Sequence, residues 1–115
     1  MASPDISLVL RALANENRMR IMEWLLDPLT NFPSQSDGDL VEDGVCVGFI
    51  TEKIGLSQPT VTAHMRQLSE AGLVTHKQIK NWVFYKPDRE AIHAAVLALW
   101  QRLVPDAKNI LFEAN

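Results

Sequence analysis

The sequence predicts a mainly α domain with one small β-hairpin (an α+β arrangement), formed by a single domain over residues 1–115. Apolar residues recur at helical spacing through most of the chain. Two short runs of β-branched and aromatic residues lie next to each other near residue 80. A chain of 115 residues, 47% hydrophobic and 22% charged, matches one ordinary globular domain or one subunit of a dimer.

Two helices are predicted at the start of the chain. Ser3 is expected to cap the first helix, with Pro4 in its first turn and apolar residues repeating over residues 6–13. Asn15 is expected to cap the second helix. That helix ends at Asp27, because the residue before a proline avoids the helical conformation.

Residues 29–44 are predicted to form a long acidic loop insertion. Its charged residues are all acidic: Asp37, Asp39, Glu42 and Asp43. Loops of this length are either functional or disordered. We expect a mobile, solvated insertion, with a lid that binds a partner or an effector as the alternative. Its negative charge is expected to keep it away from anionic partners.

Residues 48–71 predict two helices joined by a tight turn at Gly55, after a short extended piece at residues 45–47. Ser57 is expected to cap the second helix, and Gly72 to close it. One apolar stripe of this helix is expected to face the core: Val61, Met65 and Leu68. Two helices joined in this way form a helix-turn-helix.

Residues 73–86 predict a β-hairpin directly after the helix-turn-helix. The two β runs are separated only by Lys80 and Asn81, and asparagine tolerates the left-handed conformation that such a turn requires. Trp82 is expected to anchor the hairpin to the core, with exposure of its edge toward a partner as the alternative. This hairpin is the wing of the predicted fold.

The last predicted helix, residues 88–104, is apolar over too much of its circumference for one core to cover. Two adjacent stripes supply this surface: Ile92, Val96, Leu99 and Leu103, then Leu97, Trp100 and Val104. Pro105 is expected to stop the helix. In a chain this short we expect a second subunit to cover one stripe, which makes this the dimerisation helix.

The charge of the chain is unevenly distributed. The net charge is −3, yet residues 1–52 carry 3 basic and 9 acidic side chains, whereas residues 53–89 carry 6 basic and 2 acidic ones. The segment with the helix-turn-helix and the hairpin is therefore positive. This asymmetry indicates a local anionic partner, although a solvated face would have the same composition.

A helix-turn-helix followed directly by a hairpin is the winged helix-turn-helix arrangement. From Arg11 to about Ala98 the sequence resembles the ArsR/SmtB family of small dimeric bacterial transcriptional repressors. Three segments carry the resemblance: RALANENRMRIM at 11–22, GLSQPTVTAHMRQLSEAGLV at 55–74 and NWVFY at 81–85. The resemblance implies a homodimer formed through the first and last helices. Such a dimer would bind double-stranded DNA at a palindromic operator, with two recognition helices about 34 Å apart.

The second helix of such a motif lies in the major groove. The residues expected to contact DNA from this helix are Ser57, Gln58, Pro59, Thr60, Thr62, Ala63, Arg66 and Gln67. Glutamine pairs with adenine and arginine with guanine. An ordinary solvated face is the alternative, and Ser57 has a capping role in either case. His64 is expected to be packed or to bind a phosphate.

Basic residues of the hairpin extend the candidate interface. Lys77, Lys80 and Lys86 are expected to meet phosphates, beside Asn81 in the turn. On the order of four phosphate contacts per monomer would give a dimer a log–log salt slope of about −7.

The metal-binding positions of related sensors are not matched. Arsenic- and cadmium-type sensors carry Cys-Val-Cys-Asp-Leu where residues 46–50 read CVGFI, and one thiolate cannot hold a soft metal tightly. The zinc-type positions hold no ligand: Arg89, Ala91, Arg102 and Pro105. We therefore expect no metal and no other cofactor. Cys46, the only cysteine, is expected to be a small buried residue, with a redox switch as the alternative.

Several function classes are excluded or disfavoured. No apolar run approaches the roughly 18 residues of a membrane span, and no leader is visible, so a cytoplasmic protein without membrane contact is expected. No nucleophile elbow, phosphate-binding glycine loop or paired carboxylates near a histidine indicates an enzyme. The expected function is a homodimeric, sequence-specific repressor released by an unknown effector. The alternatives are a winged-helix protein-interaction module that binds no DNA and a thiol redox-responsive repressor. An effector would be sought at the acidic loop and near Cys46, Trp24 and Trp100.

Overall fold

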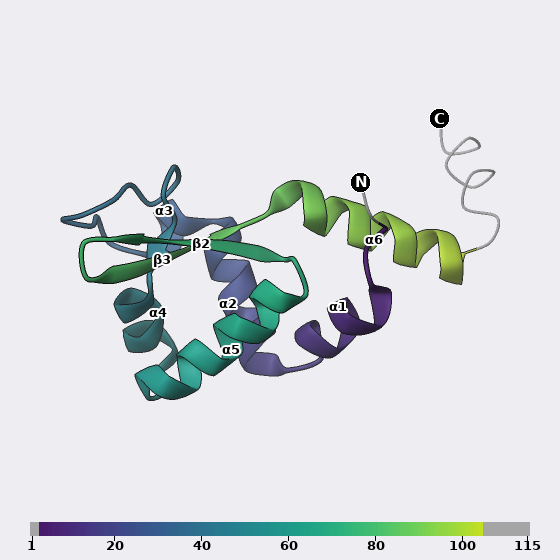
Figure 1. Ribbon diagram of the computed structural model, residues 1–115, viewed down its shortest axis with the longest axis horizontal. Helices are drawn as coiled ribbons and strands as arrows, with labels where there is room; N and C mark the ends of the chain where they lie inside the picture. Colours follow the sequence, from purple (N-terminus) through teal and green to yellow (C-terminus); the bar gives the residue numbers. More distant parts are fainter. Residues whose placement is uncertain (1–2, 105–115) are drawn as a thin grey trace.

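The computed structural model describes residues 3–104, and in it a helix-turn-helix and a small sheet lie at one end and two helices at the other (Figure 1). The elements are α1 (Ile6–Leu13), α2 (Glu16–Leu26), α3 (Pro28–Asn31), β1 (Val45–Cys46), α4 (Val47–Ile54), α5 (Gln58–Glu70), β2 (Val74–Ile79), β3 (Trp82–Pro87) and α6 (Arg89–Leu103). The three strands form one antiparallel sheet in the order β1-β3-β2. The predicted mainly α fold with a β wing is confirmed.

The first helix begins later than predicted. Asp5, not Ser3, caps α1: its side-chain oxygen accepts the backbone N–H of Leu8 at 3.0 Å, and Pro4 lies before the helix. A carboxylate is favoured at this position because the N-terminus of a helix carries partial positive charge. The predicted cap of α2 at Asn15 is confirmed.

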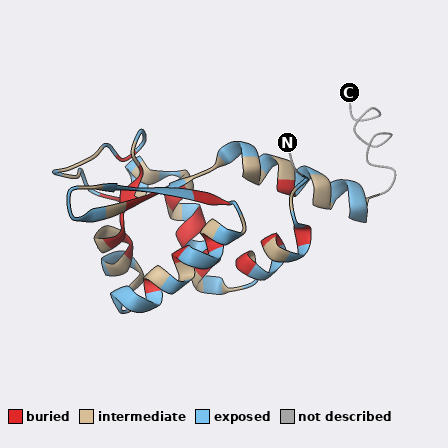
Figure 2. Ribbon diagram, viewed as in Figure 1, coloured by how far each residue is buried: buried red, intermediate tan, exposed pale blue. Residues whose placement is uncertain are grey.

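The core lies where α2, α4 and α5 meet the sheet (Figure 2). Its largest fully buried side chains come from all of these elements: Ile21, Leu25, Val45, Ile50, Val61, Met65, Leu68, Leu73 and Phe84. The turn between α4 and α5 uses Gly55 at φ +76°, a conformation that a side chain disfavours. This packing fixes α5 against the body of the domain.

The wing differs from the predicted hairpin in two respects. The predicted extended piece at residues 45–47 contributes β1, whose Val45 pairs with Tyr85 of β3. In the turn between β2 and β3, Lys80 rather than Asn81 has positive φ (56°). The Gln78 side chain donates to the Lys80 carbonyl oxygen at 3.1 Å and closes this turn. Because β1 runs directly into α4, its pairing with β3 attaches the wing to that helix.

The segment predicted as a solvated loop is folded against the wing. Residues 28–31 form α3, and only residues 32–44, which we call the acidic loop, are irregular. Phe32 and Leu40 of this loop are buried. Gly44 has φ +101°, and a Cβ there would lie 2.3 Å from the Tyr85 carbonyl oxygen, so the loop approaches β3 too closely for any other residue. The expectation of a solvated insertion is therefore wrong.

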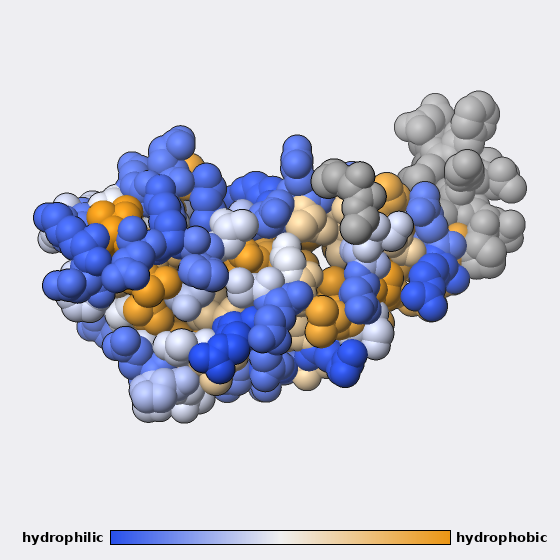
Figure 3. Space-filling model, viewed as in Figure 1, coloured by the Kyte–Doolittle hydropathy of each residue, from blue (hydrophilic) through white to orange (hydrophobic). Residues whose placement is uncertain are grey.

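Helix α6 leaves most of its apolar surface uncovered. Only Ala95 of this helix is buried, whereas Val96 is 60% and Leu103 72% exposed. Figure 3 shows apolar side chains at the surface where α1 and α6 lie together. Pro105, predicted to stop the helix, lies outside the described residues. None of the helices within residues 3–104 is both long and apolar enough to cross a membrane.

Candidate nucleic-acid interface

Helix α5 is anchored on one side and exposed on the other. The predicted stripe of Val61, Met65 and Leu68 is completely buried. The opposite face is polar, and most of the predicted contact residues are exposed: Ser57, Gln58, Pro59, Thr60, Ala63, Arg66 and Gln67. Thr62 and His64 are half-buried at its edge. The helix thus presents its N-terminal half to solvent on a rigid base.

The first turn of α5 is held by its own side chains. The Ser57 oxygen accepts the backbone N–H of Thr60 at 3.4 Å, and its hydroxyl donates to Thr60 Oγ1 at 2.8 Å. Pro59 occupies the first turn, where the missing N–H costs nothing. The exposed amides of such a turn suit a phosphate oxygen. The predicted cap at Ser57 is confirmed, and its contact with phosphate stays a prediction.

A buried arginine connects α5 to α1. Arg18 is only 7% exposed, and its guanidinium donates to the carbonyl oxygens of Ala12 at 2.6 Å and Arg11 at 3.3 Å, at the end of α1. Its Nη1 lies 2.9 Å from His64 Nδ1 on α5. Because arginine has only donors, Nδ1 must accept, and the neutral ring carries its proton on Nε2. Burial, followed by the charge of Arg18, lowers the pKa of His64.

Sequence reasoning missed this role of Arg18. The available signal was its place in the apolar stripe of α2, three and seven residues before Ile21 and Leu25. A charged residue in such a stripe is buried only with partners. The prediction of a packed role for His64 agrees with this contact.

Arg66 lies on the exposed face of α5 close to the wing. Burial raises the pKa of Tyr85 on β3, and the positive charge of Arg66 partly offsets that rise. Trp82, at the start of β3, is 47% exposed, so the expected anchor to the core is wrong and its alternative, exposure, is what the structure has.

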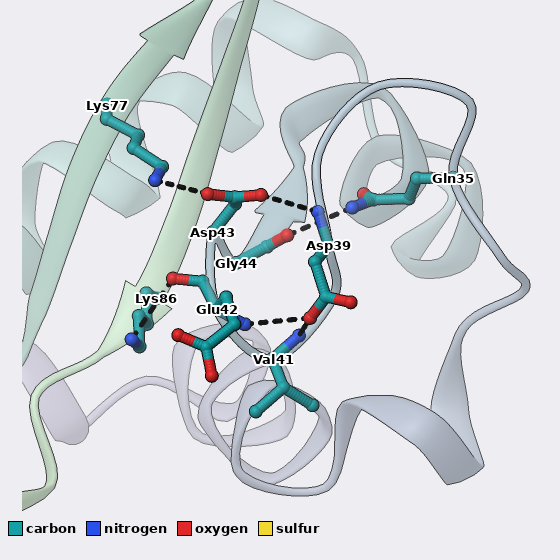
Figure 4. Close-up of polar contacts among 8 residues, drawn as sticks. All are labelled: Gln35, Asp39, Val41, Glu42, Asp43, Gly44, Lys77 and Lys86. Carbon is teal, nitrogen blue, oxygen red and sulfur yellow. Dashed lines mark hydrogen bonds and ion pairs between the residues drawn. The ribbon is translucent and has the colours of Figure 1, made fainter.

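The lysines of the wing are exposed but already have partners. Lys77 forms an ion pair with Asp43, and Lys80 Nζ lies 2.9 Å from Asp37 Oδ1. Lys86 Nζ donates to the Glu42 carbonyl oxygen at 3.1 Å. All three partners belong to the acidic loop, and Figure 4 shows the contacts of Lys77 and Lys86. The hydrogen bond from Lys77, then that from the Asp39 amide, lowers the pKa of Asp43.

Comparison with known proteins places this arrangement in a family. Residues 40–76, from the end of the acidic loop into β2, match the model of the bacterial regulatory proteins of the arsR family. The chain is 38% identical over 84 residues to the uncharacterised HTH-type transcriptional regulator YbzH of Bacillus subtilis, covering 73% of this chain and 84% of YbzH. The chain belongs to the ArsR family.

Solved structures share this fold. HlyU from Vibrio cholerae is 29% identical to this ArsR-family regulator and superposes on it with a TM-score of 0.56. The match covers 85% of the present chain and 89% of HlyU. The winged helix-turn-helix domain of Mb0332 from Mycobacterium bovis, described as homodimeric and DNA-binding, is 24% identical, covers 89% of this chain with 80% of its own and has a TM-score of 0.59.

Family membership decides between the predicted function classes. The matched proteins are transcriptional regulators, so the protein is a DNA-binding transcriptional regulator and the prediction that it is not an enzyme is confirmed. The alternative of an interaction module that binds no DNA is disfavoured.

The surroundings of Cys46 differ from those expected. Cys46 is buried and borders a cavity of about 410 Å³ whose wall includes Phe49 and Trp82. Trp24 packs instead against Phe32, with ring centroids 6.5 Å apart, and Trp100 is exposed on α6. Among residues 3–104, no three His, Cys, Asp or Glu side chains are arranged to hold a metal ion.

Proposed function

We propose that this regulator is a homodimeric repressor that reads a palindromic operator with α5. The observation that carries the proposal is the exposed, capped N-terminal half of α5, held on a fully buried apolar stripe. A rigid helix with polar side chains at its exposed N-terminal turns matches the geometry of recognition helices in major grooves. Gln58 and Arg66 are the proposed base readers, since their side chains form bidentate pairs with adenine and guanine.

The proposed dimer uses the uncovered surface of α1 and α6. Exposed apolar residues gather on these helices and on the adjacent start of α2: Leu10, Met19, Val96, Leu97, Trp100 and Leu103. Next to them lies a cavity of about 190 Å³ whose wall includes Leu13 and Ile92 and, apart from Glu23, consists of apolar residues. A second copy of the chain would remove this surface from water, which is the dominant favourable term in association. The homodimeric Mb0332 domain shares this fold.

A dimer with two copies of α5 would occupy two successive major grooves about 34 Å apart, and occupancy of a promoter would block transcription. Such a repressor acts where the chromosome is, in the bacterial cytoplasm. The cysteine-type metal positions of the family hold a single thiol, Cys46, and the zinc-type positions hold no ligand, so release by a signal other than those metals is proposed, with the effector unidentified.

The test is selection of operators from a random-sequence duplex pool, followed by titration of the selected duplex by fluorescence anisotropy. We expect Arg66→Ala to lose about 1–3 kcal/mol on the selected duplex and to discriminate less between bases. Arg20→Ala is the matched control, because Arg20 is an exposed arginine of α2 paired with Glu16. Equal losses for both variants, or no enriched sequence at low salt, would overturn the proposal.

A further inference from the structure

The acidic loop is a folded structure with its own internal contacts. The Gln35 amide accepts the N–H of Cys46 at 2.7 Å and donates to the Gly44 carbonyl oxygen at 3.0 Å, which ties the loop to β1. Asp39 Oδ1 accepts two backbone N–H groups of the following turn at 2.9 Å, and Asp43 Oδ2 accepts the Asp39 N–H at 2.6 Å (Figure 4). The loop carboxylates are therefore held in defined positions.

In these positions, oxygen atoms of the loop contact the ammonium groups of the wing. Lys77, Lys80 and Lys86 are all the lysines of the wing, and each contacts the acidic loop. Successive residues of a strand point to opposite faces, so Lys77 lies on the face opposite to His76, which contacts Ser69 of α5. The strand therefore places Lys77 on the side of the wing away from α5, and the acidic loop contacts it there.

The contacts of Lys77 and Lys80 are of the kind that a phosphate can replace. Their side chains are 50% and 72% exposed, so DNA can reach them without unfolding the core. A carboxylate and a phosphate oxygen offer a lysine the same interaction, a charge-assisted hydrogen bond. An ammonium group that is held by the loop does not neutralise a phosphate at the same time.

We propose that Asp37 and Asp43 act as intramolecular phosphate mimics, which compete with DNA for Lys80 and Lys77 and weaken operator binding. This inference rests on the proposed function, because it assumes that α5 docks on DNA with the wing nearby. The acidic loop would set the affinity of the regulator by withholding the basic side chains of the wing from the duplex.

The salt dependence of binding measures this withholding directly. With about four phosphate contacts in each monomer, a dimer has a log–log slope of about −7; with two of the four withheld by the loop, the slope is about −4. We therefore expect about −4 for the wild type and about −7 for the double variant Asp37→Asn/Asp43→Asn. The wild-type dimer must break four exposed ion pairs, two per protomer, to free these lysines for DNA, whereas the variant has none to break. The difference corresponds to roughly tenfold tighter binding by the variant at low salt.

The experiment titrates the selected duplex at several salt concentrations with the wild type and the variant. Asparagine at 43 keeps an oxygen for the Asp39 N–H, so the loop contact survives while the charge is lost. Glu42→Gln is the matched control: it removes one charge of the same loop, and only the carbonyl oxygen of Glu42 binds Lys86. Circular dichroism melting confirms that each variant is folded.

A second arm approaches from the wing. Because the loop already holds both lysines, Lys77→Gln/Lys80→Gln should weaken wild-type binding less than tenfold, and should abolish the gain from the aspartate variants. Unchanged or weaker binding by Asp37→Asn/Asp43→Asn, or an equal gain with Glu42→Gln, would overturn the inference. A log–log slope whose magnitude decreases by about 4 from the wild type to the lysine variant would also overturn the inference, because the lysines would then hold phosphates in the wild type. A wild type that binds no DNA would defeat the proposed function itself.

Discussion

Leu103→Ala tests the proposed dimer interface. Leu103 is 72% exposed on α6, so its truncation should leave the fold of the protomer intact and act on subunit association. Removing three carbon atoms costs about 2.4 kcal/mol when the leucine is fully buried, at about 0.8 kcal/mol per carbon. The exposed 72% is the part that a partner can cover, which gives about 1.7 kcal/mol per protomer.

Two-fold symmetry doubles this loss. Both subunits of a symmetric dimer carry the substitution, so the free energy of association should fall by about 3.5 kcal/mol and the dissociation constant should rise about 300-fold. Sedimentation equilibrium over a range of concentrations measures that constant. Leu29→Ala is the matched control, because Leu29 is a 71% exposed leucine on α3, away from the C-terminal end of α6 that carries Leu103. A wild-type dissociation constant for Leu103→Ala, or an equal rise for Leu29→Ala, would refute this interface.

Three further predictions concern single residues. Because the pKa of His64 is lowered in the fold, the unfolded chain takes up a proton first as the pH falls below about 6.5, and stability should decline there. Urea midpoints at pH 7.5 and 5.5 should therefore shift more for the wild type than for His64→Gln; equal shifts would contradict the contact with Arg18. Ser57→Ala should lower the free energy of unfolding by about 1 kcal/mol and Ser57→Gly by only a few tenths, measured by urea unfolding; equal losses would count against the cap. Since Cys46 is buried, DNA release by hydrogen peroxide should be equally slow for the wild type and Cys46→Ser; release of the wild type alone would establish the thiol switch instead.

The elements that local sequence determines were predictable. Helix α5 begins at a capping serine and ends before a glycine, and the wing follows from two β runs separated by two residues. These signals act over a few residues and do not depend on distant contacts. The exposed face of α5 follows from its apolar stripe, so most of the predicted contact residues of that helix are exposed, and their contact with DNA stays a prediction.

The contacts between distant segments were not predictable. Asp43 and Lys77 are separated by 34 positions, and their pairing depends on how the acidic loop crosses β3 at Gly44. Charge composition alone made the loop look solvated, because its buried anchors, Phe32 and Leu40, are isolated in a polar segment. The link from Arg18 to His64 likewise arises only when α2 packs on α5. Composition indicates the type of side chain available, whereas tertiary packing decides its partner.

In the proposed dimer, two copies of α5 enter successive major grooves. Methylation interference on a selected operator tests it most directly, because methyl groups at guanine N7 project into that groove. We expect interference in two half-sites whose centres lie about 34 Å, or about 10 base pairs, apart, and its loss from both half-sites with Arg66→Ala. Binding that tolerates methylation at every guanine of the operator, or interference in a single half-site, would show that α5 does not enter the major groove in two copies.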